Sequence, residues 1–306
     1  MPGHEEAVRY LTYNLAVPDS GATDVSFTIE LARDLSLLNR RLYESGCRSY
    51  HVKSVTVMSS NTPTTGSRVR VSTLPDTWMM RSALKRGCEK WMAQINKAAS
   101  GATSGKRIKG KWLDFRPYIN PQHVTSVAPF PVDADNNTII AGTFEWLHSE
   151  MYVEGDPNST NLCVLGEHVE SGGNYARIGL IKSWWQSRNR VHSGQPIQDD
   201  PSSDPLALGT GDGLTDEMLQ EIETHGDEPP YDHDNIIGAE YMTGLNVIHS
   251  KTIVDGYAKL PSFKVPCGAF RLDLRSGLAG TGVDDMQVTV ELAPGEYRGI
   301  KSELIA

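Results

Sequence analysis

The sequence lacks the features that mark membrane, secreted or disulfide-rich proteins. No apolar run approaches the ~20 residues needed to span a bilayer. The start MPGHEEAVRY has no apolar segment behind a basic one, as a secretory signal would. Only 4 of the 306 residues are cysteine, and they are widely spaced without a CxxC pair. We therefore expect no membrane span, no zinc ribbon and no disulfide framework, with the thiols packed as small buried side chains.

Catalytic motifs are also missing. There is no GxSxG, no HExxH, no HxH followed by Glu, and no compact Cys and His pair. Gly101–Arg107 (GATSGKR) has the wrong spacing for a phosphate-binding loop. Asp133, Asp135 and Asn137 begin like an EF-hand loop but lack its glycine and final glutamate, which favours an Asx-rich turn. We read Asp232–Asp234 as a surface loop. The sequence thus predicts no enzyme activity, no cofactor and no metal site.

What the chain does contain is a strand-rich pattern in a soluble composition, with 39% hydrophobic and 22% charged residues. Period-2 alternation or β-branched enrichment indicates about eleven strands without an alternating strand–helix repeat, which favours an antiparallel sheet structure. The candidates are Arg9–Val17, Val25–Leu31, Tyr50–Ser59, Arg68–Leu74, Lys111–Arg116, Thr138–Trp146, Asn161–Leu165, Ala176–Ile181, Asn246–Val254, Val265–Arg275 and Met286–Leu292.

Two segments break this pattern with helical spacing, Asp34–Ser45 and Met79–Lys97. A small-residue and basic loop is expected at 98–110, and a Pro, Gly and Asp-rich excursion follows later in the chain, with a short helix at Leu214–Thr224. No internal repeat or boundary in composition is visible, so we predict one domain over 1–306 with long loops.

Charge is divided unevenly along the chain. Residues 1–125 hold 18 Lys and Arg against 10 Asp and Glu, whereas residues 126–306 hold 11 against 28, or +8 against −17. Within 81–116, ten basic residues face only Glu89 and Asp114. In contrast, the acidic loop at 191–240 contains no Lys or Arg. A concentrated basic region suits a polyanion, and an acidic one repels nucleic acid, although either run can also serve as solvated surface.

Trp184 and Trp185 stand beside Lys182, Arg188 and Arg190. Aromatic and basic side chains together can stack on single-stranded nucleic acid. A Trp pair next to the apolar Ile178–Ile181 is more often part of a core or an interface, which is the reading we prefer.

The order strand, short helix, strand in VSFTIELARDLSLLNRRLYESGCRSYHVKSVTVMSS (Val25–Ser60), many later strands with large excursions, and the last strand MQVTVELA resemble single jelly-roll capsid proteins. The nearest are those of small circular single-stranded DNA viruses, the smacovirus-like and other circular Rep-encoding groups. The resemblance implies an all-β, two-sheet antiparallel jelly-roll sandwich with helical insertions. It also implies that copies of the chain form an icosahedral shell around a genome of single-stranded DNA, in a virion without a membrane.

Many such capsid proteins begin with an Arg- or Lys-rich arm, whereas the first ten residues here hold Glu5, Glu6 and only one Arg or Lys, Arg9. Genome binding would then use folded residues that neutralise phosphates without reading bases. The candidates are Arg81, Lys85, Arg86, Lys90, Lys106, Arg107, Lys109 and Lys111. We expect the acidic loop on the outer surface, away from the DNA.

Two other functions fit a β-sandwich. One is binding or cleavage of carbohydrate, which would need exposed aromatic side chains and carboxylates in a groove. The other is a receptor-binding or spike-like oligomer. A fold shared by lectins and capsids does not decide among the three.

Overall fold

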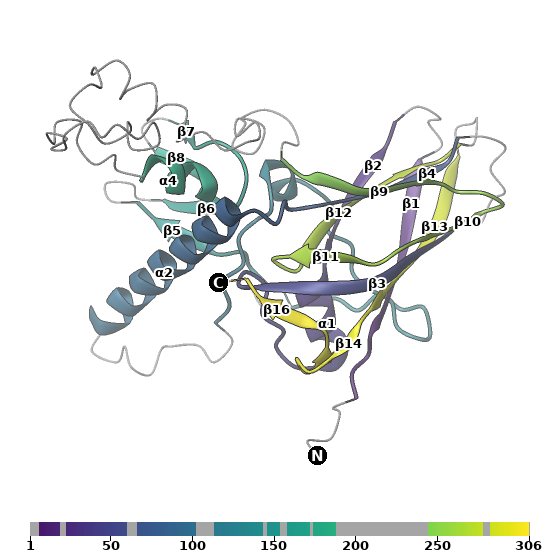
Figure 1. Ribbon diagram of the computed structural model, residues 1–306, viewed down its shortest axis with the longest axis horizontal. Coiled ribbons are helices and arrows are strands. Elements are labelled where there is room, and N and C mark those ends of the chain that lie inside the picture. Colours follow the sequence, from purple (N-terminus) through teal and green to yellow (C-terminus); the bar gives the residue numbers. More distant parts are fainter. Residues whose placement is uncertain are drawn as a thin grey trace, which may run out of the picture.

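The computed structural model describes residues 6–18, 23–59, 66–101, 113–142, 146–153, 158–171, 174–187, 244–277 and 282–305. In these residues, two curled antiparallel sheets lie face to face, and a region that contains two helices stands beside them (Figure 1). The basic loop from residue 102 onward, the acidic loop at 191–240 and the helix predicted at Leu214–Thr224 lie outside the described residues.

The first sheet has the strand order β1-β13-β3-β10, and β11 and β16 pair along the remaining length of β3. All of these pairs are antiparallel. The strands are β1 (Tyr10–Pro18), β3 (Arg48–Ser59), β10 (Tyr257–Leu260), β11 (Phe263–Pro266), β13 (Val283–Leu292) and β16 (Ser302–Leu304). A short hairpin of β14 (Pro294–Gly295) and β15 (Gly299–Ile300) lies between β13 and β16 in the chain.

The second sheet has the order β2-β12-β4-β9, again with only antiparallel pairs. Its strands are β2 (Val25–Glu30), β4 (Arg68–Thr73), β9 (Asn246–Thr252) and β12 (Ala269–Arg275). Helix α1 (Leu31–Asn39) follows β2 directly. The predicted antiparallel, mostly β structure therefore agrees with both sheets.

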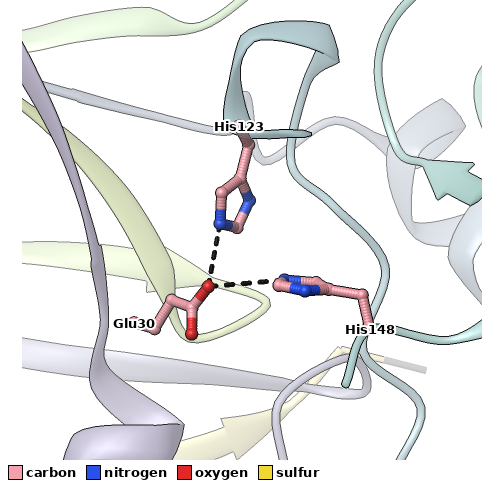
Figure 2. Close-up of side chains that lie close together, drawn as sticks. All are labelled: Glu30, His123 and His148. Atoms are coloured by element: carbon pink, nitrogen blue, oxygen red, sulfur yellow. Dashed lines mark hydrogen bonds and ion pairs between the residues drawn. The ribbon is translucent and has the colours of Figure 1, made fainter. Parts of the chain in front are cut away.

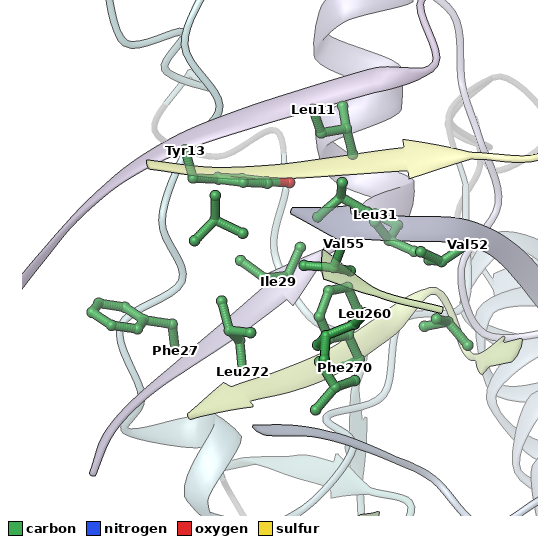
Figure 3. Packing of buried hydrophobic residues seen from close by; sticks show 14 of the residues in the cluster. Leu11, Tyr13, Phe27, Ile29, Leu31, Val52, Val55, Leu260, Phe270 and Leu272 are labelled. Carbon is green, nitrogen blue, oxygen red and sulfur yellow. The ribbon is translucent and has the colours of Figure 1, made fainter. Parts of the chain in front are cut away.

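The main core fills the layer between the two sheets. Alternate residues of β1, among them Leu11 and Tyr13, are fully buried, as the period-2 pattern of the sequence predicts. Figure 3 shows these two side chains converging with Ile29 and Leu272 of the second sheet. Burial of side chains of this size contributes about 1.5–3 kcal/mol each to folding.

The described residues between β4 and β9 form a second region, which we call the insert (74–101, 113–142, 146–153, 158–171, 174–187 and 244–245). Its described elements are α2 (Trp78–Gly101), the 3-10 helix η1 (Pro121–Val124), β5 (Glu150–Tyr152), β6 (Ser159–Cys163), β7 (Val169–Ser171), β8 (Asn174–Gly179) and α4 (Leu180–Gln186). The strands form a sheet in the order β5-β6-β8-β7. Its β6–β8 pair is parallel, an exception to the antiparallel structure predicted.

The insert packs around a second hydrophobic cluster. Met80, Leu84 and Trp91 of α2 pack there with Leu180 and Ile181 of α4. Cys267, Ala269 and Ile305 of the sandwich belong to the same cluster, so the insert is packed onto the sandwich. The sequence pattern predicted neither this second core nor its position. The assignment of residues 1–306 to one domain stays a prediction.

Several predicted elements need correction. Described residues 113–116 and 139–142 form no strand, so the strands predicted at Lys111–Arg116 and Thr138–Trp146 are wrong. Single contacts, such as the one from the amide of Gly46 to the carbonyl of Phe115, replace a continuous ladder there. The predicted strand Ala176–Ile181 ends at Gly179, where α4 begins. Residues 98–101 of the basic loop predicted at 98–110 instead belong to α2, which continues to Gly101.

Two further corrections concern turns. Val265–Arg275 is split by Cys267 and Gly268, both with positive φ, and this turn carries the chain from the first sheet to the second. The helix predicted at Asp34–Ser45 instead runs over Leu31–Asn39 and ends at Arg40 in the left-handed conformation. The Asx turn is confirmed, since Asp133 Oδ1 accepts the amides of Asp135 and Asn137 at 2.9 and 2.8 Å.

Candidate functional site

Four of the eight predicted nucleic-acid residues lie within the described part of the chain, on α2. Arg81, Lys85 and Lys90 are exposed, and Arg86 is half-buried. The side opposite them packs into the cluster of the insert, and the helix predicted at Met79–Lys97 is confirmed. Lys106, Arg107, Lys109 and Lys111 lie outside the described residues.

The four α2 cations differ in their contacts. Arg81 forms two hydrogen bonds with Asp76, at 2.7 and 2.8 Å, so its charge is compensated. Arg86 donates from Nη1 to the carbonyl of Ser183 at 2.9 Å and so fastens α2 to α4. Lys85 and Lys90 place their side chains on the exposed face. Of the four, these two lysines are the best placed to meet a phosphate backbone.

The tryptophan pair belongs to α4 and packs partly against the cluster of the insert. Trp184 meets Trp78 edge to face, with ring centroids 5.1 Å apart. These contacts agree with the packing role that the sequence favoured.

A second candidate site is a group of polar side chains that the sequence did not single out. Glu30 ends β2, His123 lies in η1, and His148 precedes β5 (Figure 2). Glu30 Oε1 lies 2.9 Å from His123 Nε2 and 3.4 Å from His148 Nε2. Glu30 and His123 are 93 positions apart, so no local motif could reveal the group. The Glu30 cluster, as we call these three residues, links the sandwich to the insert.

The residue types of the Glu30 cluster are those that bind zinc, and the three ligand atoms lie within 4.8 Å of one another. However, the amide of Ile119 donates to His123 Nδ1 at 3.2 Å. A neutral imidazole that accepts at Nδ1 carries its proton on Nε2, which then has no lone pair for a metal. Arg33 Nη1 also lies 3.0 Å from Glu30 Oε2. The cluster therefore fits a hydrogen-bonded junction better than a metal centre.

The cluster continues into a buried ionic network through Arg33. Arg33 Nε donates to Asp34 Oδ1 at 2.8 Å, and the Tyr13 hydroxyl donates to Asp34 Oδ2 at 2.6 Å. Asp34 is fully buried, and this burial raises its pKa to about 7. Burial acts in the same direction on Glu30, but hydrogen bonds from His123 and His148 hold its pKa well below the usual range. One guanidinium thus lies between two buried carboxyl groups.

The tautomer of His123 leads to a prediction about metal. Adding Zn²⁺ to the full-length chain should leave its melting temperature unchanged, because a ligand raises Tm only if it binds the folded state. Differential scanning fluorimetry with and without EDTA measures this. A Zn²⁺-dependent rise that disappears in His148→Ala but persists in His51→Ala would contradict it. His51 is a matched control because it also pairs with a carboxylate, Glu303, at 2.9 Å.

His123 also predicts a pH dependence. Burial lowers its pKa, so the folded state binds this proton less readily than the unfolded chain does. The stability contributed by neutral His123 is therefore present above its ordinary pKa of about 6.5 and is lost as the pH falls through the lowered value. The raised pKa of Asp34 acts oppositely, with stability lost as the pH rises through about 7, but this effect is common to wild type and a His123 variant.

Urea unfolding of wild type and His123→Gln between about pH 8 and about pH 5 isolates the histidine, with a slope difference of up to roughly 1.4 kcal/mol per pH unit. The wild type should lose more stability than the variant on acidification. Parallel curves for the two proteins would show that His123 is not the titrating group. His249→Gln, on the exposed strand β9, serves as control and should follow the wild type.

No protein-family model, curated protein or solved structure matches this chain. Among the described helices, none is long and apolar enough to cross a membrane. Function is therefore inferred from the strand order, the charges and the contacts of the chain itself.

Proposed function

We propose that the chain is a jelly-roll capsid subunit that assembles with copies of itself into a closed shell around nucleic acid. The observation that carries the proposal is the strand order. The eight principal strands in chain order are β1, β2, β3, β4, β9, β10, β12 and β13. One sheet holds the first, eighth, third and sixth of them, and the other holds the second, seventh, fourth and fifth. This order supports a jelly roll, the fold of many viral capsid domains.

Because lectins and cupins share the jelly roll, the fold needs support from other features. A carbohydrate site generally presents aromatic side chains around a groove. The strongly exposed aromatic side chains of the described residues are Tyr10, Trp78, Tyr152 and Tyr257. They lie on four different elements, β1, α2, β5 and β10. This scatter favours the capsid over the carbohydrate alternative.

The charge distribution supports a shell with two different surfaces. The ten basic residues of 81–116 face only two acidic ones, and α2 presents part of that charge on an exposed face. We propose that this face and the basic residues after it neutralise packaged single-stranded DNA. The acidic loop at 191–240 would repel DNA and suits the outside of the particle.

The insert supports assembly in another way. It places a long stretch of chain between the fourth and fifth principal strands, at one side of the sandwich (Figure 1). It is packed to the sandwich through a shared hydrophobic cluster, so it can present a fixed surface to neighbouring subunits. Long, well-supported excursions of this kind extend a subunit beyond its sandwich without loosening the core.

Negative-stain electron microscopy of the purified full-length chain tests the proposal. Uniform closed particles whose nucleic acid survives nuclease treatment support the capsid. A monomer under all salt and pH conditions would contradict it, and glycan-array binding by that monomer would support the carbohydrate alternative. A small oligomer of fixed size would instead support the receptor-binding alternative.

A further inference from the structure

Two cysteines face each other across the boundary between the sandwich and the insert. Cys47 immediately precedes β3, and Cys88 lies in the middle of α2. Their Sγ atoms are 3.4 Å apart, whereas a disulfide bond is about 2 Å long. We infer that Cys47 and Cys88 are a redox-active pair that forms an intramolecular disulfide and locks the insert to the sandwich.

The backbone on the Cys47 side is held in place. The preceding Gly46 donates its amide to the carbonyl of Phe115 at 2.8 Å, and a Cβ at Gly46 would lie only 2.1 Å from that oxygen. The carbonyl of Cys47 accepts the amide of Ile305 at 2.9 Å. Cys47 is therefore fixed to both the insert and the end of the first sheet.

The helix on the Cys88 side is equally constrained. Gly87 lets the side chain of Leu180 approach α2, with 3.0 Å from its methyl carbon to the position of a Cβ. Arg86 bonds the carbonyl of Ser183 in the same turn. Because both backbones are held, the two sulfur atoms stay close to each other.

The other two thiols are less suited to oxidation. Cys163 and Cys267 are buried, and each S–H points to a backbone carbonyl, that of Asn120 and of Gly46 respectively. Burial raises the pKa of the Cys163 thiol to about 12 and also raises that of the Cys267 thiol, which disfavours the reactive thiolate. Cys47 and Cys88 are only half-buried, so a small oxidant can reach them.

The contact between the two thiols also assigns their roles. The Cys47 thiol donates to Cys88 and lowers the pKa of Cys88, while that hydrogen bond raises the pKa of Cys47. Cys88 is thus the thiolate that attacks a low-molecular-weight disulfide such as oxidised glutathione. This step forms a mixed disulfide and releases one glutathione thiol. Cys47 then loses its proton, attacks the Cys88 sulfur and releases the second glutathione, so two thiols are oxidised and one disulfide is reduced.

The product would close a covalent ring between residues 47 and 88, joining β3 to α2. Without the disulfide, the covalent connection from β4 of the sandwich to the start of α2 is the short segment from Leu74 to Thr77. The inference does not depend on the proposed function, because both thiols belong to one chain.

Equilibration of the full-length chain with reduced and oxidised glutathione, alkylation and peptide mapping test the inference. Two of the four thiols should disappear, and one linked peptide should contain Cys47 and Cys88. The melting temperature should rise by about 5 °C or more on oxidation. Cys163→Ser is the matched control and should still form the link.

Cys47→Ser should prevent the link and leave Cys88 bearing glutathione, as the assigned roles require. Four free thiols in the wild type under oxidising buffer would overturn the inference, as would a link to Cys267 or a covalent dimer. An unchanged melting temperature despite the Cys47–Cys88 link would overturn the locking role. The peptide map of the wild type decides the pairing even if a variant fails to fold.

Discussion

Replacing Arg33 by Met should lower the free energy of unfolding by about 3–5 kcal/mol, the cost of leaving buried charges without their partner. The Arg33 side chain is only 7% exposed and lies between Glu30 and Asp34. Methionine keeps much of the aliphatic stem but removes the charge and all of the hydrogen bonds. Urea or guanidinium unfolding followed by circular dichroism measures the loss.

Two comparisons test the cause. Arg81→Met removes an ion pair with Asp76 whose side chains are 50% and 36% exposed, and should cost less than about 1 kcal/mol. The double variant Arg33→Met/Asp34→Asn also removes one of the two carboxyl groups that lose their partner. The double variant should therefore lose less unfolding free energy than the sum of the losses in Arg33→Met and in Asp34→Asn. Equal losses for Arg33→Met and Arg81→Met would show that the buried network does not stabilise the fold.

Replacing Lys106, Arg107, Lys109 and Lys111 together by Gln should strongly weaken binding to single-stranded DNA. Each phosphate contact contributes about 0.7 to the slope of log affinity against log salt, so four lost contacts should flatten that slope by about 3. Lys85→Gln/Lys90→Gln, on the exposed face of α2, should flatten it by about 1.4 for two contacts. Arg81 and Arg86 stay unchanged in this design because they bond Asp76 and Ser183.

Fluorescence anisotropy with a labelled oligonucleotide across a salt series measures both variants, and the ratio of absorbance at 260 to 280 nm reports the nucleic acid in purified particles. Lys251→Gln/Lys259→Gln, on β9 and β10 of the sandwich, is a control that removes the same charge as the α2 pair. An unchanged slope in the quadruple variant would refute its contact with DNA.

The quadruple variant also distinguishes a second role for these cations. If they instead pair with the acidic loop of a neighbouring subunit, DNA affinity should hardly change but assembly should fail. To test this alternative, the charges of Asp227, Glu228, Asp232 and Asp234 are reversed in the quadruple variant, and assembly is measured again. If both DNA binding and assembly are unchanged, the four basic residues serve only as solvated surface.

The sequence alone determined most strands of the sandwich and the long helix of the insert. In β1, Leu11 and Tyr13 are buried and their neighbours are exposed or half-buried, and this alternation follows from strand geometry without any knowledge of the partner. Met80, Leu84 and Trp91 recur at helical spacing, so α2 was predictable for the same reason. The sequence shows a regular spacing of apolar residues in these elements because one face of each element must be buried.

Tertiary structure alone decided which distant residues meet. Glu30, His123 and His148 come together only because β2, η1 and the segment before β5 converge, and no spacing in the sequence encodes that convergence. The approach of Cys47 to Cys88 likewise depends on how α2 packs against the start of β3. The parallel pairing of β6 and β8 was equally hidden, because a short apolar run does not specify its partner or its direction. Contacts between elements depend on the packing of the whole chain, whereas the spacing of apolar residues within one element depends only on residues near each other in the sequence.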